Sequence, residues 1–168
     1  FGCIGNFSKP EFYEIVEDIY RYLEATQHSI VMFADAVREV NPLPQIPIKK
    51  AEEIIQECDL ILSIGGDGTI LSTFHQIGRK NVPILGIKSG GLGFLAECTE
   101  ENYLDGIDCI IAGDYTVGDR MLLEVNINNG AEHSNFALND IVIEHGKLAR
   151  LIYIHVYVGG EFLNTYEG

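Results

Sequence analysis

A glycine-rich turn that holds one carboxylate is the part of this sequence best suited to chemistry. Residues 65–69 read Gly-Gly-Asp-Gly-Thr and follow the apolar run 60–64. Glycines lack a Cβ, so backbone N–H groups at Gly66, Gly68 and Thr69 can approach phosphate oxygens, and a following helix adds its positive end. Asp67 would repel phosphate unless it accepts the proton of an attacking hydroxyl, holds a metal ion or caps the helix. The turn favours phosphate chemistry and leaves these three roles open.

Other nucleotide signatures are absent from the sequence. It contains neither G-x-x-x-x-G-K-[ST] nor G-x-G-x-x-G, so it predicts neither a Walker loop nor classical dinucleotide binding. The cations near the expected site are few: Lys88, Lys147 and Arg150. A phosphoryl donor would bring about four negative charges to this acidic chain, which implies a divalent cation such as Mg²⁺. The sequence offers no dedicated cage of metal ligands for it.

The elements around this turn read as an α/β fold. Short apolar runs at 1–5, 29–33, 60–64 and 82–87 alternate with helical stripes at 12–23, 51–58, 70–77 and 103–111. That alternation is typical of a parallel, Rossmann-like sheet with crossover helices, and we assign it to a nucleotide-binding domain over residues 1–115. A second glycine-rich turn occupies 90–93. Thr99 is the expected cap of the last helix and Gly113 its end.

After Tyr115 the apolar period changes from helical to alternating. Residues 123–127, 141–143 and 152–158 predict three strands, and Gly159-Gly160 predicts a hairpin turn. We interpret residues 116–168 as the start of an all-β domain, of the β-sandwich type, that is cut off early. The chain also begins without Met inside an apolar run, so we expect it to be part of a longer protein.

Composition narrows the class of partner. The 168 residues include 25 acidic and 11 basic side chains, a formal charge of −14 that disfavours nucleic acid and anionic lipid as partners. No apolar run approaches the length of a membrane span. Four scattered cysteines without a C-x-x-C pair predict reduced thiols in a cytoplasmic protein, and no histidine pattern predicts a zinc site.

Four segments together resemble the NAD kinases. They are the GGDGT turn, the stretch 90–95 (GGLGFL), residues 120–124 (RMLLE) and residues 137–140 (ALND), in this order. The resemblance spans roughly residues 59–168. The GGDGT turn is shared with diacylglycerol kinases, sphingosine kinases and phosphofructokinases, whereas the LGFL and LND segments are more specific.

The resemblance implies transfer of the γ-phosphoryl of ATP, or of polyphosphate in some members, to the 2′-hydroxyl of the adenosine ribose of NAD, giving NADP. By resemblance, Asp67 would be the base, Gly68 would line the same site and Phe94 would border the adenine. Asn139 and Asp140 would hold adenosine and its ribose hydroxyls, and Arg150 would contact the dinucleotide. Relatives are usually homodimers or homotetramers.

This sequence departs from the family at two positions and at its end. Lys88 stands where many relatives have Asn, and Asp140 where Glu is common, which shortens the reach but keeps the carboxylate. The family segments that complete the nucleotide sites are not in this sequence, so we expect it to carry the acid and half of the binding surface. A lipid kinase of the same superfamily and a non-catalytic nucleotide sensor are the alternatives.

Overall fold

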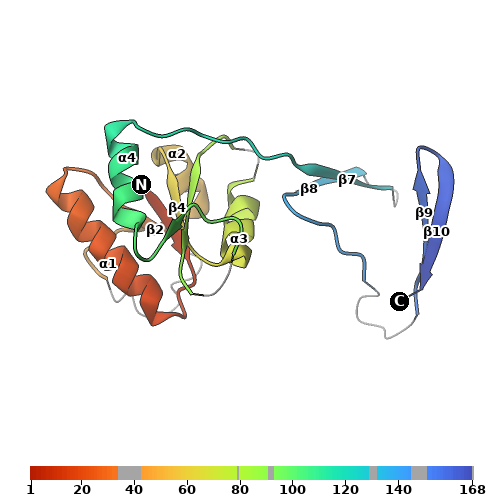
Figure 1. The fold of residues 1–168 in the computed structure, drawn as a ribbon, viewed down its shortest axis with the longest axis horizontal. Helices are drawn as coiled ribbons and strands as arrows, with labels where there is room; N and C mark the ends of the chain where they lie inside the picture. Colours follow the sequence, from red (N-terminus) through yellow and green to blue (C-terminus); the bar gives the residue numbers. More distant parts are fainter. Residues whose placement is uncertain (34–42, 79, 91–92, 129–131, 145–150, 168) are drawn as a thin grey trace. The chain divides into compact units, whose positions relative to one another are not determined.

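The computed structural model describes residues 1–33, 43–78, 80–90, 93–128, 132–144 and 151–167 (Figure 1). The chain divides into two compact units, Phe1–Arg120 and Met121–Gly168, and each is described by itself.

A six-stranded parallel sheet forms the centre of the first unit, with the strand order β3-β2-β1-β4-β5-β6. The strands are β1 (Gly2–Gly5), β2 (Val31–Phe33), β3 (Ile48–Lys49), β4 (Ile61–Gly65), β5 (Ile84–Lys88) and β6 (Cys98–Thr99). The chain moves outward from β1 to β3 and then returns to add β4 on the other side of β1. The strand order therefore reverses between β1 and β4, and open parallel sheets bind ligands outside the carboxyl ends of their strands at such a reversal.

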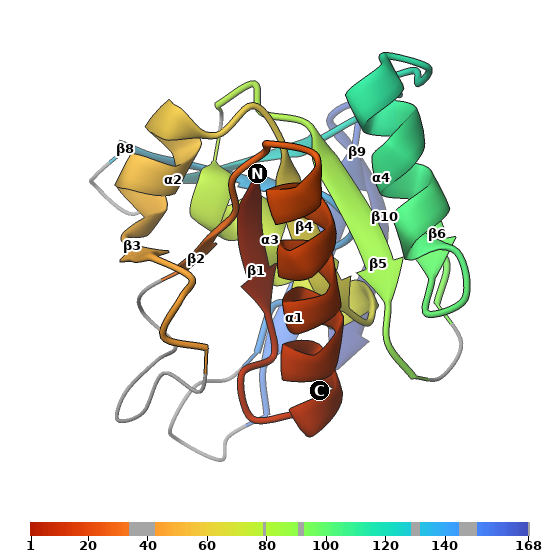
Figure 2. The same cartoon turned by 90° about the vertical axis from the view of Figure 1, so that its left-hand side faces the viewer.

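Helices cover both faces of this sheet (Figure 2). Helices α1 (Pro10–Ala25) and α4 (Tyr103–Ala112) lie on one face, and α2 (Ala51–Glu57) and α3 (Asp67–Ile77) on the other. Successive residues of a strand point to opposite faces, so Cys3 packs in the core with α1 and α4 whereas Ile4 packs with α2 and α3. The buried stripe of α1 is the predicted one: Phe12, Ile15, Val16, Ile19 and Leu23.

The start of α4 differs from the prediction. Thr99 does not cap this helix: it lies in β6, where it pairs with Lys88, and the N-cap residue is Asn102. Pairing in the sheet holds Thr99 in an extended conformation, so the helix begins after it. Gly113 does end the helix, in the left-handed conformation with φ of 73°.

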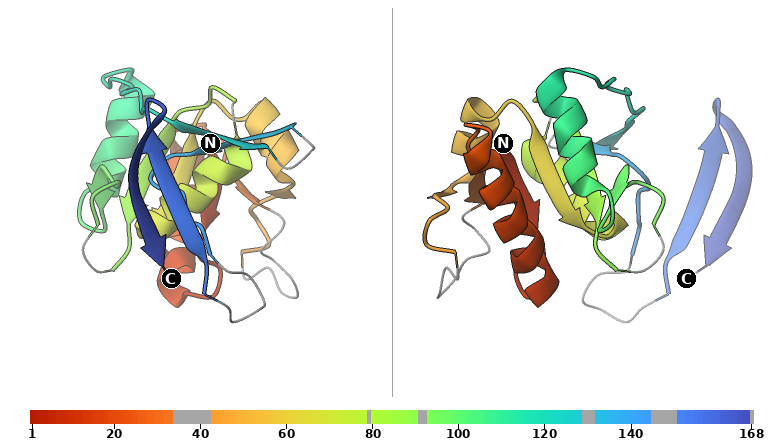
Figure 3. Two further views of the ribbon diagram at one scale, coloured as in Figure 1. Left: turned by 90° about the vertical axis from the view of Figure 1, so that its right-hand side faces the viewer. Right: turned by 60° about the vertical axis from the view of Figure 1, so that its left-hand side comes forward.

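The second unit contains two antiparallel pairs of strands. Strands β7 (Leu123–Asn128) and β8 (Glu132–Ala137) form one pair, and β9 (Tyr153–Val158) and β10 (Glu161–Glu167) form the other. Strands β9 and β10 form the predicted hairpin (Figure 3). Gly159 and Gly160 in its turn have φ of 61° and 88°, as such a turn requires.

The predicted strand at 141–143 is wrong. Those residues have no regular strand structure, and the partner of β7 is β8, whose polar sequence carries little apolar alternation. Strand β8 forms because its backbone pairs with that of β7. Backbone pairing does not require alternating apolar side chains, so the apolar pattern did not predict this strand.

The fold class is confirmed, because a parallel α/β sheet is followed by antiparallel strands. Within the described ranges, none of the helices is long and apolar enough to cross a bilayer.

Candidate active site

Strand β4 ends at the carboxyl edge of the sheet, and the glycine turn follows it there. All five residues of β4 are buried, which is why its sequence is apolar apart from Ser63. Gly65 has φ of 155°, and a Cβ there would lie 2.3 Å from Oγ1 of Thr69. Both the conformation and the close approach of Thr69 therefore require glycine at position 65. Gly66 is exposed and occupies the N-cap position of α3.

Asp67 is the first residue of α3 and its side chain is partly exposed. The interpretation of Asp67 as a helix cap is wrong, because Gly66 holds that position and no side chain caps the helix. Instead the carboxylate accepts hydrogen bonds from two backbone N–H groups of the second glycine-rich segment. The N–H of Phe94 lies 3.1 Å from Oδ1 and 3.0 Å from Oδ2, and that of Leu95 lies 3.1 Å from Oδ1.

These bonds join two segments that follow neighbouring strands. Strands β4 and β5 pair in parallel, with Gly65 opposite Lys88, so both glycine-rich segments leave the sheet at the same edge. Of the second segment, residues 91 and 92 lie outside the described residues. The side chain of Phe94 is 96% exposed while its N–H is bound to Asp67. Its ring is therefore available for a ligand.

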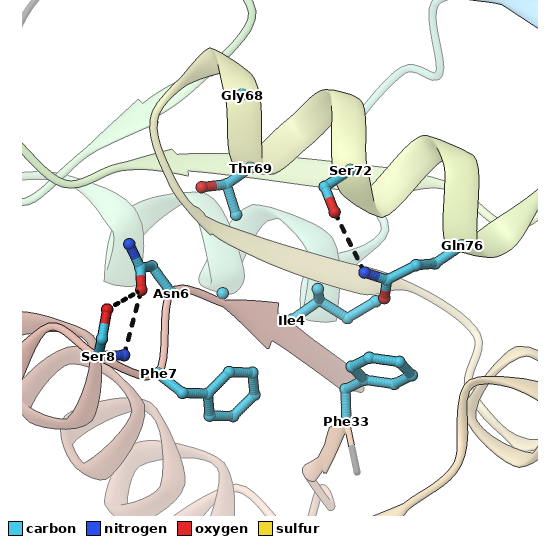
Figure 4. Close-up of a pocket in the computed structure, with 10 residues that line it drawn as sticks. Ile4, Asn6, Phe7, Ser8, Phe33, Gly68, Thr69, Ser72 and Gln76 are labelled. Atoms are coloured by element: carbon cyan, nitrogen blue, oxygen red, sulfur yellow. Dashed lines mark hydrogen bonds between the residues drawn. The ribbon is translucent and has the colours of Figure 1, made fainter. Parts of the chain in front are cut away.

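A cavity of about 390 Å³ lies at the reversal of strand order (Figure 4). One wall comes from β1 and the loop after it, and the other from α3, with Phe33 at the end of β2. The polar side chains that line it are neutral: Asn6, Ser8, Thr69, Ser72 and Gln76. Gly68 also lines it, which places part of the GGDGT turn at its edge.

The polar side chains that line this cavity differ in the hydrogen bonds that they form. Asn6 Oδ1 accepts hydrogen bonds from the N–H and the hydroxyl of Ser8, at 3.1 and 2.6 Å. Gln76 donates to Ser72 at 3.2 Å, and its buried Oε1 has no hydrogen-bond partner within the described chain. Our sequence reasoning missed Asn6, Ser8, Ser72 and Gln76. The available signal was that Asn6 and Ser8 follow a strand that ends at the same edge as β4.

Lys88 lines a second cavity, of about 180 Å³, with Gly90, Thr99, Glu100 and Glu101. A hydrogen bond from the Thr99 hydroxyl and, more weakly, the charge of Lys88 hold the pKa of Glu101 below its usual range. The lysine thus has an acidic neighbourhood that already offsets part of its charge.

The remaining predicted site residues belong to the second unit. Asn139 and Asp140 follow β8 and are both exposed, and Asn139 donates to Asp140 Oδ1 at 3.4 Å. Arg150 and Lys147 lie outside the described residues. The structure thus brings together the turn at Gly66–Thr69 and Phe94.

The comparisons with known proteins agree on one family. The family described as ATP-NAD kinase N-terminal domain matches residues 1–115. NAD kinase of Heliobacterium modesticaldum is 35% identical over 168 residues, which cover 99% of this chain and 58% of that protein. NAD kinase of Chlorobium luteolum is 34% identical over 168 residues, with 99% and 57% covered. The chain therefore spans little more than half the length of these relatives.

Two solved structures share the fold. A yeast NADH kinase complexed with NADH superposes with a TM-score of 0.78 at 22% identity, covering 98% of this chain and 53% of that one. An NAD kinase from Archaeoglobus fulgidus in complex with ATP gives a TM-score of 0.69 at 22% identity, with 99% and 57% covered.

Proposed function

The chain belongs to the NAD kinase family, and from that premise we propose that the protein phosphorylates the 2′-hydroxyl of the adenosine ribose of NAD to give NADP. The observation that carries the proposal is the placement of Asp67. Its carboxylate is bound to backbone N–H groups of the neighbouring segment, at the edge where this fold type binds ligands. A fixed, partly exposed acid beside a glycine turn suits a general base better than a helix cap.

The reaction assigns a role to each group. Asp67 would take the proton of the 2′-hydroxyl as that oxygen attacks the γ-phosphorus of ATP. The bond between the γ-phosphorus and the oxygen bridging to the β-phosphate breaks, and ADP leaves. Backbone N–H groups at Gly66 and Gly68 and the hydroxyl of Thr69, with the positive end of α3, would stabilise phosphate charge without a basic side chain.

The resemblance assigns further residues to the acceptor. Phe94 would border the adenine with its exposed ring. Asn139 and Asp140 would hold the adenosine and its ribose hydroxyls, and Arg150 would contact the dinucleotide. The yeast neighbour is a complex with NADH, which supports a dinucleotide as the acceptor.

We propose ATP with Mg²⁺ as the donor, with polyphosphate as the alternative. The Archaeoglobus neighbour is a complex with ATP. Within the described ranges, no group of three side chains could hold a metal ion. Mg²⁺ fits this arrangement because it commonly takes one or two carboxylates together with substrate phosphates and water. With Asp67 assigned to the substrate hydroxyl, the ion would be held mainly by phosphate oxygens of ATP and by water, and it would neutralise charge on the triphosphate.

We further propose a cytoplasmic homodimer or homotetramer. Free thiols at Cys3, Cys58, Cys98 and Cys109 suit a reducing compartment. Large apolar side chains are exposed on the second unit, including Met121 and Val142 at 86% and 75%. Surfaces of this kind are normally covered by further protein, whether of the same chain or of a second copy.

The deciding experiment uses the full-length protein with NAD, Mg²⁺ and either ATP or polyphosphate, and measures NADP. We expect NADP formation, and a fall in kcat of about 10²–10⁴-fold in Asp67→Asn with NAD binding changed little. Asp114→Asn, at an exposed position with no assigned role, is the matched control. Labelled phosphate entering lipid vesicles and not NAD would indicate a lipid kinase. Saturable binding of NAD without product would indicate a nucleotide sensor.

A further inference from the structure

Gly93 lies directly against the carboxylate of Asp67. A Cβ built on Gly93 would meet Asp67 Oδ1 at 2.7 Å, Cγ at 3.3 Å and Oδ2 at 3.6 Å, and these are its three nearest atoms. The space that a side chain at position 93 would fill is therefore taken by the acid.

The backbone conformation of Gly93 does not itself require glycine. Its φ is outside the left-handed region, in contrast to Gly90 in the same segment, which has φ of 92°. The φ of position 93 is open to alanine, and the nearest atoms that its methyl group would meet belong to Asp67.

The two oxygens of the Asp67 carboxylate accept different sets of hydrogen bonds. Oδ1 accepts from the N–H groups of both Phe94 and Leu95, whereas Oδ2 accepts only from the N–H of Phe94, at 3.0 Å. An ionised carboxylate has about four acceptor sites, so Oδ2 keeps capacity for a further proton donor. Oδ1 anchors the side chain and Oδ2 is the oxygen available to a substrate hydroxyl.

We propose that Gly93 is a positioning residue for the reaction. Because it has no side chain, Asp67 reaches the N–H groups of Phe94 and Leu95 and presents Oδ2 in one orientation. This inference rests on the proposed function for its kinetic consequence, while the contact itself is independent of the activity.

The variant Gly93→Ala should displace the carboxylate of Asp67 without unfolding the protein. The atoms that must move are the far end of a flexible side chain, so the fold can absorb the methyl group by displacing the carboxylate. A displacement of about 1 Å can cost about 10²-fold in rate. In the full-length protein we expect kcat to fall about 100-fold, with KM for NAD and ATP changed less than about threefold and the melting temperature kept.

Gly118→Ala is the matched control. Gly118 also lacks a left-handed φ, and its Cβ would meet only the end of the Arg120 side chain, at 3.3 Å. We expect this variant to keep wild-type kcat. Wild-type kcat in Gly93→Ala, or an equal loss in both variants, overturns the proposal.

A double variant distinguishes positioning from general damage. If Gly93 acts through Asp67, adding Gly93→Ala to Asp67→Asn costs little more than Asp67→Asn alone, since residues acting as a unit are not additive. A further loss of about 100-fold would mean that Gly93 acts elsewhere, and the proposal fails.

Amide NMR of the full-length protein tests the contact without any activity. We expect Gly93→Ala and Asp67→Ala to shift the amide signals of Phe94 and Leu95 in the same direction, because both remove the carboxylate from them. Unchanged signals in Gly93→Ala overturn the inference. Absence of NADP formation by the wild-type protein would instead reject the proposed function and leave this result standing.

Discussion

Phe94 shows how one residue can serve the site through two separate groups. Its N–H binds the carboxylate of Asp67, and its ring is 96% exposed. The backbone contact is independent of the side chain, so a substitution can remove the ring and leave the position of the acid intact. The two roles of Phe94 can therefore be separated by kinetics.

We predict that Phe94→Ala raises KM for NAD about tenfold and changes kcat less than about threefold. Stacking of a base on an aromatic side chain contributes about 1–3 kcal/mol, and the N–H that holds Asp67 remains. Steady-state kinetics of the full-length protein measures both parameters. Tyr115→Ala, which removes a half-exposed ring with no assigned role, is the control. An unchanged KM for NAD would exclude the ring from the acceptor site.

A buried polar contact joins helix α3 to strand β4. The hydroxyls of Ser63 and Thr73 lie 2.9 Å apart, and both residues are fully buried. Ser63 lies in the strand before the turn and Thr73 in the helix that begins at Asp67. The contact therefore helps to hold this helix in place on the sheet. A buried hydroxyl without a partner costs more than the bond itself contributes.

We predict that Thr73→Val lowers the free energy of unfolding by about 1–3 kcal/mol because it leaves the Ser63 hydroxyl unpaired. Adding Ser63→Ala should restore part of that loss, since both polar groups are then absent. Urea denaturation of the two single variants and the double variant measures the coupling. A double variant whose loss is the sum of the single losses would show that the two hydroxyls do not depend on each other.

The sequence predicted most elements of the first unit and missed its two shortest strands. The stripe of α1 and the buried run of β4 are each specified by local apolar pattern. Strands β3 and β6 have two residues each, too few to show a period, and β8 is defined by its pairing with β7. The apolar pattern of a sequence indicates which residues are buried, whereas the pairing of a strand depends on a partner that is distant in the sequence.

The sequence predicted part of the candidate site, as it predicted part of the fold. The glycine turn follows a buried strand, which is a local signal, and Asp67 was singled out from it. The contact between Asp67 and Phe94 joins residues 27 positions apart and requires the parallel register of β4 and β5. The cavity wall at Asn6 and Ser8 was missed because its signal, a polar loop after a strand that ends at this edge, becomes useful only once the strand order is known.

The two units of the molecule differ in how much apolar surface they bury. The first has two hydrophobic clusters on opposite faces of its sheet. The second consists of strand pairs whose large side chains are mostly exposed, among them Tyr153 and Phe162 at 61% and 58%. Isolated two-stranded hairpins are marginally stable in water.

We therefore predict that residues 1–120 fold alone and residues 121–168 do not. The first fragment should unfold cooperatively on heating and show dispersed amide signals, while the second should show neither. Circular dichroism melting and NMR of the two separate fragments decide this. A non-cooperative first fragment would show that its core depends on the rest of the protein.

The stability of the whole fold should fall at alkaline pH through the thiol of Cys3. This residue is fully buried in β1, and burial raises the pKa of its thiol far above the ordinary value. Above about pH 8.5 the unfolded chain loses this proton while the folded chain retains it, so the unfolded state binds fewer protons. The stabilisation is complete below the unfolded pKa and declines as pH rises above it.

We predict a fall in the free energy of unfolding that approaches about 1.4 kcal/mol per pH unit from this group well above pH 9. Cys3→Ala should be less stable at neutral pH, because it leaves a small void, and should show a flatter alkaline slope. Cys109→Ala, which replaces an exposed thiol, is the control. Urea denaturation at pH 7 to 10.5 under reducing conditions provides the comparison. Equal slopes in the wild-type protein and Cys3→Ala would mean that the buried thiol is not the group that titrates.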